Sequence, residues 1–217
     1  MTTNKEDYLK AIYHCGGLYK RVATKEVAKK LGIASASVTE MIARLAKEEL
    51  LSYEPYKGSQ LTQKGIDACI NVVRSHELWE VFLVKYLGCS LSEAHKDAEE
   101  LEHATSPILA ERLDHFLNMP AVCPHGAMIP RPGNIPPNRN LIPLSSIPAG
   151  DTAVISQIEE NKELLDYLEP LGIVTGIRLT VEQYGAYEGP LELLIENRSI
   201  QLSRKAAEQI WVLSNAT

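Results

Sequence analysis

The chain has 217 residues and a formal net charge of −6, and 45% of its residues are hydrophobic and 23% charged. These values are typical of a soluble globular protein with one large or two small domains, and no apolar run reaches the ~20 residues of a membrane-spanning helix. The four cysteines form no CxxC pair and the N-terminus has no signal-peptide core, so we expect a cytoplasmic protein without disulfides or a zinc ribbon.

Basic residues are concentrated in the N-terminal part of the chain. Residues 20–64 contain nine Lys/Arg and five Asp/Glu, whereas the rest of the chain contains 13 Lys/Arg and 23 Asp/Glu. A local excess of positive charge on an otherwise acidic protein indicates a basic contact surface, of the kind that binds nucleic acid.

The first 64 residues have the pattern of a winged helix-turn-helix. A short helix is predicted with Thr24 as its N-cap and Gly32 at its end, and a second helix follows with Ser35 as its predicted N-cap. Residues 51–53 and 60–62 then read as two strands on either side of a turn. Helix, glycine-containing turn, helix and hairpin in this order predict a DNA-binding domain with a wing.

The second helix and the wing supply the candidate DNA contacts. Short hydroxyl side chains at the start of such a helix can approach phosphates and base edges, and arginine can bond phosphate or guanine. The candidates are Ser35, Ser37, Thr39, Glu40, Arg44, Lys57 and Ser59. A helical hairpin with a polar surface, or a winged helix that binds another protein, is the alternative interpretation.

The next segment predicts three helices with surplus apolar surface. Ser90 and Glu93 have the spacing of a capping box, and Ser106 followed by Pro107 is a typical helix start. The apolar positions of these helices exceed what a small winged helix can cover. We therefore expect a helical dimerisation domain, in which a second subunit buries the surplus.

The C-terminal third changes to short strands after a proline-rich segment. Residues 119–150 hold eight of the twelve prolines and are predicted to be a linker. Residues 177–181, 191–193 and 200–202 alternate as strands, and residues 161–168 predict a helix. A small β-barrel is expected here.

Four residues suggest a site for a hard cation. Glu99, Glu102 and His103 are spaced i, i+3 and i+4, so on a helix they project from one face. With Asp7 from the N-terminal helix they would provide three carboxylates and an imidazole, and a metal held by them would couple its concentration to the placement of the DNA-reading helix. The ordinary alternatives are an acid in a first helical turn, a solvated acidic face and a histidine at a helix end.

A second group of potential ligands is more scattered. The candidates are His76, Glu80, His95, Cys123, His125, Glu160 and Glu163. The cysteine and the third histidine lie in the loop Cys-Pro-His-Gly, which can wrap an ion without breaking a helix. The helix histidines are more commonly ordinary helix residues.

Taken together, these features resemble the diphtheria toxin repressor family of metal-dependent transcriptional repressors over essentially the whole chain. The motifs that carry the resemblance are residues 6–13 (EDYLKAIY), 37–39 (SVT), 76–83 (HELWEVFL), 99–103 (EELEH) and 123–126 (CPHG). The resemblance implies a mainly α protein with a small β domain. Its parts would be a winged helix (1–64), a helical metal-binding and dimerisation domain (65–118), the linker (119–150) and an SH3-like β-barrel (151–217).

The branch of the family is indicated by two ligand positions. Iron regulators carry Met at the position of Asp7 and Cys at that of Glu99, whereas carboxylates at both resemble the manganese-responsive, three-domain regulators of streptococci. Oxygen in place of sulfur favours Mn²⁺ over softer metals. The resemblance implies a primary site of Asp7, Glu99, Glu102 and His103 and a secondary site of Glu80, Cys123, His125 and Glu160. The iron-type secondary site would instead use His76, Glu80, His95, Glu160 and Glu163.

One position departs from the shorter manganese regulators. These carry a further Glu one turn after the aspartate and bind two ions in one cluster. This chain has Lys10 there, a cation that would oppose a second ion. We therefore expect separate mononuclear sites.

These observations predict a homodimeric repressor that binds a palindromic operator when Mn²⁺ is bound, with genes for manganese uptake as the expected targets. Fe²⁺ is the alternative physiological metal, and Zn²⁺ or Cd²⁺ could substitute. A metal-dependent hydrolase is a second alternative. Because the chain has no nucleophile elbow, HExxH or phosphate-binding Gly-rich loop, we predict no enzyme and no catalytic residue.

Overall fold

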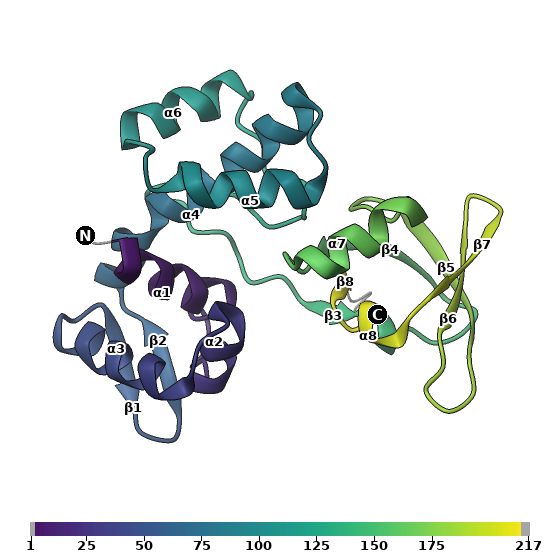
Figure 1. The fold of residues 1–217 in the computed structure, drawn as a ribbon, viewed down its shortest axis with the longest axis horizontal. Coiled ribbons are helices and arrows are strands. Elements are labelled where there is room, and N and C mark those ends of the chain that lie inside the picture. Colours follow the sequence, from purple (N-terminus) through teal and green to yellow (C-terminus); the bar gives the residue numbers. More distant parts are fainter. Residues whose placement is uncertain (1–2, 214–217) are drawn as a thin grey trace. The chain divides into compact units, whose positions relative to one another are not determined.

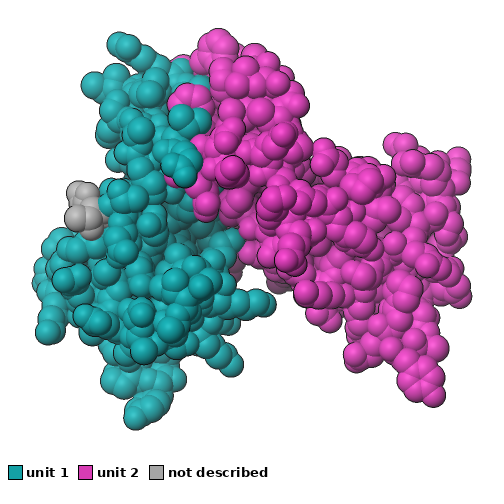
Figure 2. Space-filling view, viewed as in Figure 1, with its two compact units in different colours: residues 1–76, 100–113, 130–136 teal, residues 77–99, 114–129, 137–217 magenta. Residues whose placement is uncertain are grey.

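The computed structural model describes residues 3–213, which form two compact units (Figure 2). Unit 1 comprises residues 1–76, 100–113 and 130–136, and unit 2 comprises residues 77–99, 114–129 and 137–217. Within the described residues, no helix is long and apolar enough to cross a bilayer.

Unit 1 contains the predicted winged helix-turn-helix (Figure 1). Its elements are α1 (Thr3–His14), α2 (Thr24–Leu31), α3 (Ser35–Lys47), β1 (Leu51–Glu54) and β2 (Gly58–Leu61). Val38, Ile42 and Leu45 lie at i, i+4 and i+7 of α3 and are fully buried against α1 residues such as Leu9 and Ile12. This apolar stripe fixes which face of α3 remains exposed.

The N-caps of the two short helices differ from the prediction. The structure places them one residue earlier, at Ala23 and Ala34, so the assignment of Thr24 and Ser35 as N-caps is wrong. In α2, Ala23 N donates to the Glu26 carboxylate at 3.0 Å, so a residue in the first turn replaces the expected cap. Gly32 ends α2 as predicted, with a φ of 66° that suits glycine.

Three helices follow, and the predicted start signals of the second and third are confirmed. They are α4 (Gln63–Leu87), α5 (Leu91–Glu102) and α6 (Pro107–Phe116). Glu93 N donates to Ser90 Oγ at 3.3 Å and Ser90 N donates to Glu93 Oε2 at 2.9 Å, which is the reciprocal pairing of a capping box. Leu109 N donates to Ser106 Oγ at 3.2 Å.

The C-terminal part of unit 2 is built on one antiparallel sheet of order β3-β8-β4-β5-β6-β7 (Figure 1). The strands are β3 (Leu141–Pro143), β4 (Thr152–Ile158), β5 (Arg178–Tyr184), β6 (Leu191–Ile195), β7 (Arg198–Leu202) and β8 (Ile210–Leu213). The short helical elements are η1 (Leu144–Ser146), α7 (Lys162–Leu168), η2 (Glu169–Leu171) and α8 (Arg204–Ala207). Strand β3 falls in the segment predicted as linker.

Buried and partly exposed residues alternate along the strands, which shows which face of the sheet packs into the core. In β6, Leu191, Leu193 and Ile195 are buried and the residues between them are partly exposed. Helix α7 adds Leu165 and Leu168 to the same cluster, and its N-cap Asn161 accepts a hydrogen bond from Leu164 N at 3.1 Å. The loop that precedes β3 bonds this sheet, because Ile158 N of β4 donates to His125 O at 2.9 Å.

Candidate metal-binding sites

In unit 1, α1 and the end of α5 bring together three of the four predicted primary ligands. Asp7, Glu102 and His103 each offer a ligand atom, and these atoms lie within 4.8 Å of one another. His103 Nε2 lies 3.0 Å from Asp7 Oδ1 and 3.2 Å from Glu102 Oε1. The two carboxylates and the imidazole nitrogen therefore converge as donor atoms of a cation site do.

The orientation of His103 is held by a residue that sequence reasoning missed. Glu6 Oε2 lies 3.0 Å from His103 Nδ1, on the opposite edge of the ring from Asp7. A carboxylate on one ring nitrogen fixes the tautomer and the orientation of the ring, so that the other nitrogen can serve as a ligand atom. The only signal in the sequence is that Glu6 neighbours Asp7.

Glu102 is the buried member of this group. Its carboxylate accepts hydrogen bonds from Lys10 Nζ at 2.6 and 2.8 Å, and His76 Nδ1 lies 2.6 Å from Glu102 Oε2. Burial acts to raise the pKa of Glu102, but the hydrogen bond from His76 and the charge of Lys10 outweigh it and the pKa is lowered. Burial raises the pKa of Asp7, the charge of His103 opposes this, and Glu102 adds to the rise.

The fourth predicted primary ligand, Glu99, belongs to unit 2. Its side chain is 56% exposed, and its Oε1 lies 3.8 Å from His95 Nε2. Glu99 lies three residues before Glu102, the last residue of α5. Its role in the primary site remains a prediction.

In unit 2, three predicted secondary ligands come together in the interior. Glu80 of α4 and the loop residues Cys123 and His125 are buried, and their ligand atoms lie within 4.8 Å of one another. Glu80 Oε2 lies 2.8 Å from His125 Nδ1 and Glu80 Oε1 lies 3.0 Å from His95 Nδ1. A carboxylate, a thiol and an imidazole form a donor set that suits several divalent transition metals.

His125 also carries a buried nitrogen that a metal ion would satisfy. Among the described residues, its Nε2 has no hydrogen-bond partner although the side chain is fully buried. Leaving such a group unsatisfied is costly, and a coordinated metal would satisfy it. Burial lowers the pKa of His125, but the charge and hydrogen bond of Glu80 outweigh it and the pKa is raised.

The Cys123 thiol is held in its protonated form. Burial raises its pKa, and the charges of Glu77, Glu80 and Glu160 raise it further. Glu77, a buried residue that sequence reasoning did not single out, also hydrogen-bonds this thiol. Its spacing of i, i+3 from Glu80 was the available signal.

The backbone of the Cys-Pro-His-Gly loop is fixed against the sheet. Ile158 N donates to His125 O at 2.9 Å, and Cys123 N donates to Ala127 O at 2.9 Å. Gly126 has a φ of 87°, and a Cβ on it would lie 2.0 Å from Ser156 O. Only glycine fits this close approach to β4, which explains the fourth residue of the motif.

The remaining ligand candidates are placed as follows. His76 is fully buried in α4 of unit 1, where it bonds Glu102, and His95 on α5 bonds Glu80 in unit 2. Glu160 is partly buried and acts electrostatically on Cys123, whereas Glu163 is exposed in the first turn of α7.

The candidate DNA contacts, with one exception, are accessible. Ser35, Ser37, Thr39, Glu40 and Arg44 are exposed on α3, and Lys57 is exposed in the β1–β2 turn. Ser59 is the exception, because it is fully buried in β2 and its backbone exchanges hydrogen bonds with Val22 at 2.7 and 2.9 Å. Its inward position argues against the predicted contact between its side chain and DNA.

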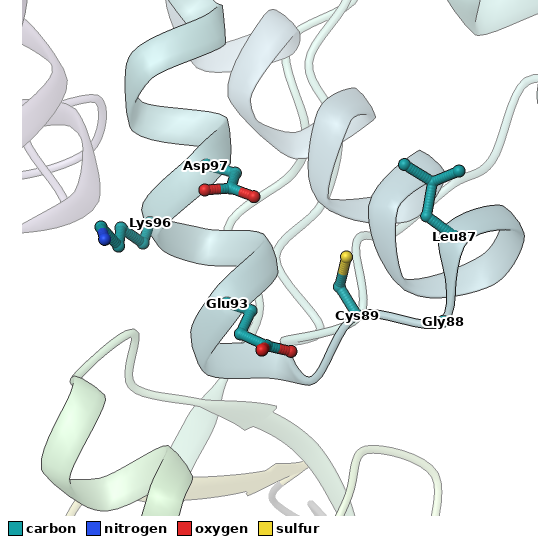
Figure 3. A pocket seen from close by; sticks show the side chains of 6 residues that line it. All are labelled: Leu87, Gly88, Cys89, Glu93, Lys96 and Asp97. Carbon is teal, nitrogen blue, oxygen red and sulfur yellow. The ribbon is translucent and has the colours of Figure 1, made fainter.

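A surface pocket in unit 2 lies at the turn between α4 and α5 (Figure 3). It is lined by Leu87, Gly88, Cys89, Glu93, Lys96 and Asp97. None of these is a predicted ligand, and the cysteine here is not part of the buried Cys123 group.

Comparison with known proteins covers all three parts of the chain. The profile described as "Iron dependent repressor, N-terminal DNA binding domain" matches residues 1–59, and "Iron dependent repressor, metal binding and dimerisation domain" matches residues 62–131. The profile "FeoA domain" matches residues 142–213.

Individual relatives agree with these profiles. The iron-dependent repressor IdeR of Mycobacterium tuberculosis is 30% identical over 192 residues, which are 82% of this chain and 83% of the relative. A manganese-dependent transcriptional repressor in complex with manganese is 32% identical with a TM-score of 0.85, over 97% of this chain and 99% of that one. The structure of ScaR with bound Cd²⁺ is 35% identical with a TM-score of 0.80, over 96% and 98% of the two chains.

Proposed function

This chain belongs to the diphtheria toxin repressor family of metal-dependent transcriptional repressors, and we propose that it is a manganese-dependent repressor of manganese-uptake genes. It acts in the cytoplasm, where operator DNA lies. Its relatives are DNA-binding repressors and not enzymes, so the hydrolase alternative is set aside.

The observation that carries the choice of metal is the donor set in unit 1. Asp7, Glu102 and His103 converge through oxygen and nitrogen atoms, and the fourth proposed ligand, Glu99, is also a carboxylate. Hard oxygen donors suit Mn²⁺, whereas sulfur ligands favour softer metals. The similar repressor in complex with manganese supports this assignment.

The ligand residues link two functional parts of unit 1. Asp7 belongs to α1 of the winged helix, whereas Glu102 is the last residue of α5 and His103 follows it. Asp7, Glu102 and His103 would hold a divalent cation there, and its charge would offset the repulsion between the two carboxylates. By sharing one ligand set, α1 and α5 restrain each other, and the α3 helices of a dimer would be held at the ~34 Å repeat of a palindromic site.

Metal dependence also requires an energetic difference between two states. The metal must bind the DNA-competent state more tightly than the state that does not bind DNA, because equal affinity for both states shifts no equilibrium. A change from mostly free to mostly bound DNA needs about 5.5 kcal/mol of differential affinity. Two sites in each subunit can share this amount.

We assign the secondary site to Glu80, Cys123, His125 and Glu160. The unpartnered His125 Nε2 and the buried thiol supply the main support. A thiol also accepts softer metals, which agrees with Zn²⁺ or Cd²⁺ as substitutes and with the bound Cd²⁺ of ScaR. Lys10 in place of a further ligand supports separate mononuclear sites.

The DNA contacts are assigned to the exposed residues Ser35, Ser37, Thr39, Glu40, Arg44 and Lys57.

A homodimer is supported by an aromatic cluster in unit 2. Phe82 and Tyr86 stack at 5.7 Å, and Phe116 lies 5.2 Å from Tyr86, between ring centroids. Phe116 is 57% exposed and Tyr86 44% exposed, and a second subunit would bury them.

An iron-responsive repressor is the second candidate. It is favoured by the identity to IdeR over most of the chain, and oxygen and nitrogen donors also accept Fe²⁺.

Substitution of the proposed ligands tests which residues set the preference between Mn²⁺ and Fe²⁺. Asp7→Met and Glu99→Cys each introduce a sulfur donor, so the proposed ligands predict that either variant shifts the metal response from Mn²⁺ towards Fe²⁺ or Zn²⁺. The measurement is DNA binding titrated with each metal, with Fe²⁺ kept anaerobic. An unchanged metal preference in both variants would remove Asp7 and Glu99 from the site.

A further inference from the structure

Lys10 is a buried lysine beside the proposed primary site. Its side chain lies on α1, one turn after Asp7, and is 11% exposed. Lysine is almost never buried unless its charge is paired. Here the pairing partner is Glu102, whose two carboxylate oxygens lie 2.6 and 2.8 Å from Lys10 Nζ.

Glu102 is therefore both the ion-pair partner of Lys10 and a proposed ligand of the metal. An ionised carboxylate only accepts hydrogen bonds, so His76 Nδ1, at 2.6 Å, donates to the same group that Lys10 neutralises. His103 Nε2, the atom that faces Asp7, lies 3.2 Å from Glu102 Oε1. An ion held by Asp7 and His103 needs an oxygen that the ammonium already binds.

We propose that Lys10 sets the metal affinity of the primary site: its ammonium is a built-in cation that competes with the metal ion for Glu102. The inference rests on the proposed function, in which Asp7, Glu102 and His103 bind metal. Lys10 thereby sets the metal concentration at which the site fills.

Two physical effects act in opposite directions on the two states. Without metal, Lys10 neutralises a carboxylate that would otherwise be a costly buried charge. With metal, the ammonium and a divalent ion repel each other across the same carboxylate, and burial weakens the screening by solvent. Removing the charge must lower the stability of the protein without metal and raise its affinity for metal. A purely structural ion pair would show only the first effect.

The chain offers a matched control on the same helix. Lys5 Nζ bonds Glu48 Oε1 at 2.6 Å, but both side chains are partly exposed and neither touches a proposed ligand. Lys5→Met removes an ion pair from α1 without removing a competitor for Glu102.

The test is Mn²⁺ binding by the full-length protein, followed by the electron paramagnetic resonance signal of free Mn²⁺. In Lys10→Met we expect half-saturation of the Asp7-dependent site at about tenfold lower Mn²⁺ than in the unsubstituted protein. Lys10→Arg keeps the charge and should restore the original value, and Lys5→Met should not change it. The thermal midpoint of Lys10→Met should fall without metal and recover with Mn²⁺.

Lys10→Gln gives the same comparison with a side chain that can still hydrogen-bond Glu102, should the methionine variant not fold. Affinity that is unchanged or weaker in the neutral variants would overturn the role of Lys10. Asp7→Ala separates this from a failure of the proposed function. If Asp7→Ala removes no Mn²⁺ site, the primary site itself is wrong. If it removes one while the Lys10 variants bind like the unsubstituted protein, only the competition is wrong.

Discussion

At the scale of single residues, the secondary site depends on protons. The pKa of the Cys123 thiol is raised well above 9.0, first by burial and then by the charges of Glu77, Glu80 and Glu160. The pKa of His125 is raised from 6.5 because Glu80 stabilises its charged form more than burial disfavours it. Metal ligands must be deprotonated, so both groups hold protons that a metal has to displace.

We therefore predict that metal binding at this site releases protons and strengthens as pH rises. His125 is protonated to a higher pH than a free histidine, so affinity should fall as pH decreases through its raised pKa. Because the thiol releases one proton when it binds the metal, the affinity for metal should rise about tenfold for each unit of increasing pH. Calorimetric titration with Mn²⁺ in buffers of different ionisation enthalpy measures the protons released.

The matched control uses another cysteine of unit 2. Cys123→Ser should release about one proton fewer, whereas Cys89→Ser, in the pocket at the α4–α5 turn, should release the same number as the unsubstituted protein. Equal proton release in all three proteins would exclude the thiol as a ligand.

The sequence indicated which residues could bind a metal better than it indicated which hydrogen bonds they make. Spacing and residue type identified Asp7, Glu102 and His103, which the structure brings together in unit 1. Glu6 and Glu77 were missed because the residue type and helical spacing of an acid do not show which group it will hydrogen-bond. The inward position of Ser59 was also hidden, since it depends on a bridge to Val22, 37 residues away.

At the scale of elements, α5 carries the proposed ligands Glu99 and Glu102 close to its end, His103 follows it directly, and its start is fixed by a capping box. Ser90 Oγ and the Glu93 carboxylate satisfy backbone N–H groups reciprocally. The backbone and side-chain hydrogen bonds from Ser90 lower the pKa of Glu93. The cap therefore depends on the charge state of Glu93.

We predict that Ser90→Ala lowers the free energy of unfolding by about 1 kcal/mol at neutral pH. Because the pKa of Glu93 is lowered from 4.5 in the folded state, its contribution is present above that value and is lost as pH falls through the folded pKa. Urea unfolding of the protein without metal, at neutral and acidic pH, tests this.

Glu93→Gln is the control, because glutamine can make the same backbone contact without a charge. It should keep most of the stability and lose this part of its pH dependence. An Ser90→Ala variant as stable as the unsubstituted protein would show that the cap does not hold α5.

Local patterns predicted the helices and the wing, whereas half of the C-terminal sheet required contacts distant in sequence. Strands β5, β6 and β7 are hairpin neighbours, and their alternation was visible. Strand β8 lies between β3 and β4, so its pairing joins residues 141–143 and 152–158 to the end of the chain. The Pro-rich sequence around β3 gives no strand signal of its own.

At the scale of the whole molecule, the proposed function joins a metal site to DNA binding. The family binds operator DNA as dimers, and unit 1 contains both the exposed face of α3 and the Asp7, Glu102 and His103 group. Lys10 of α1 and the metal compete for Glu102 in this unit, so the metal concentration determines which of them α1 shares with Glu102. The central claim is that this link controls the affinity for DNA.

Fluorescence anisotropy of a labelled palindromic duplex, titrated with the full-length protein, tests this claim most directly. We predict tight binding with Mn²⁺, loss of binding with a chelator, and loss of the Mn²⁺ response in Asp7→Ala, with a scrambled duplex as the control for sequence. Equally tight binding with Mn²⁺ and with chelator would contradict it, because metal would then not control the DNA-binding state.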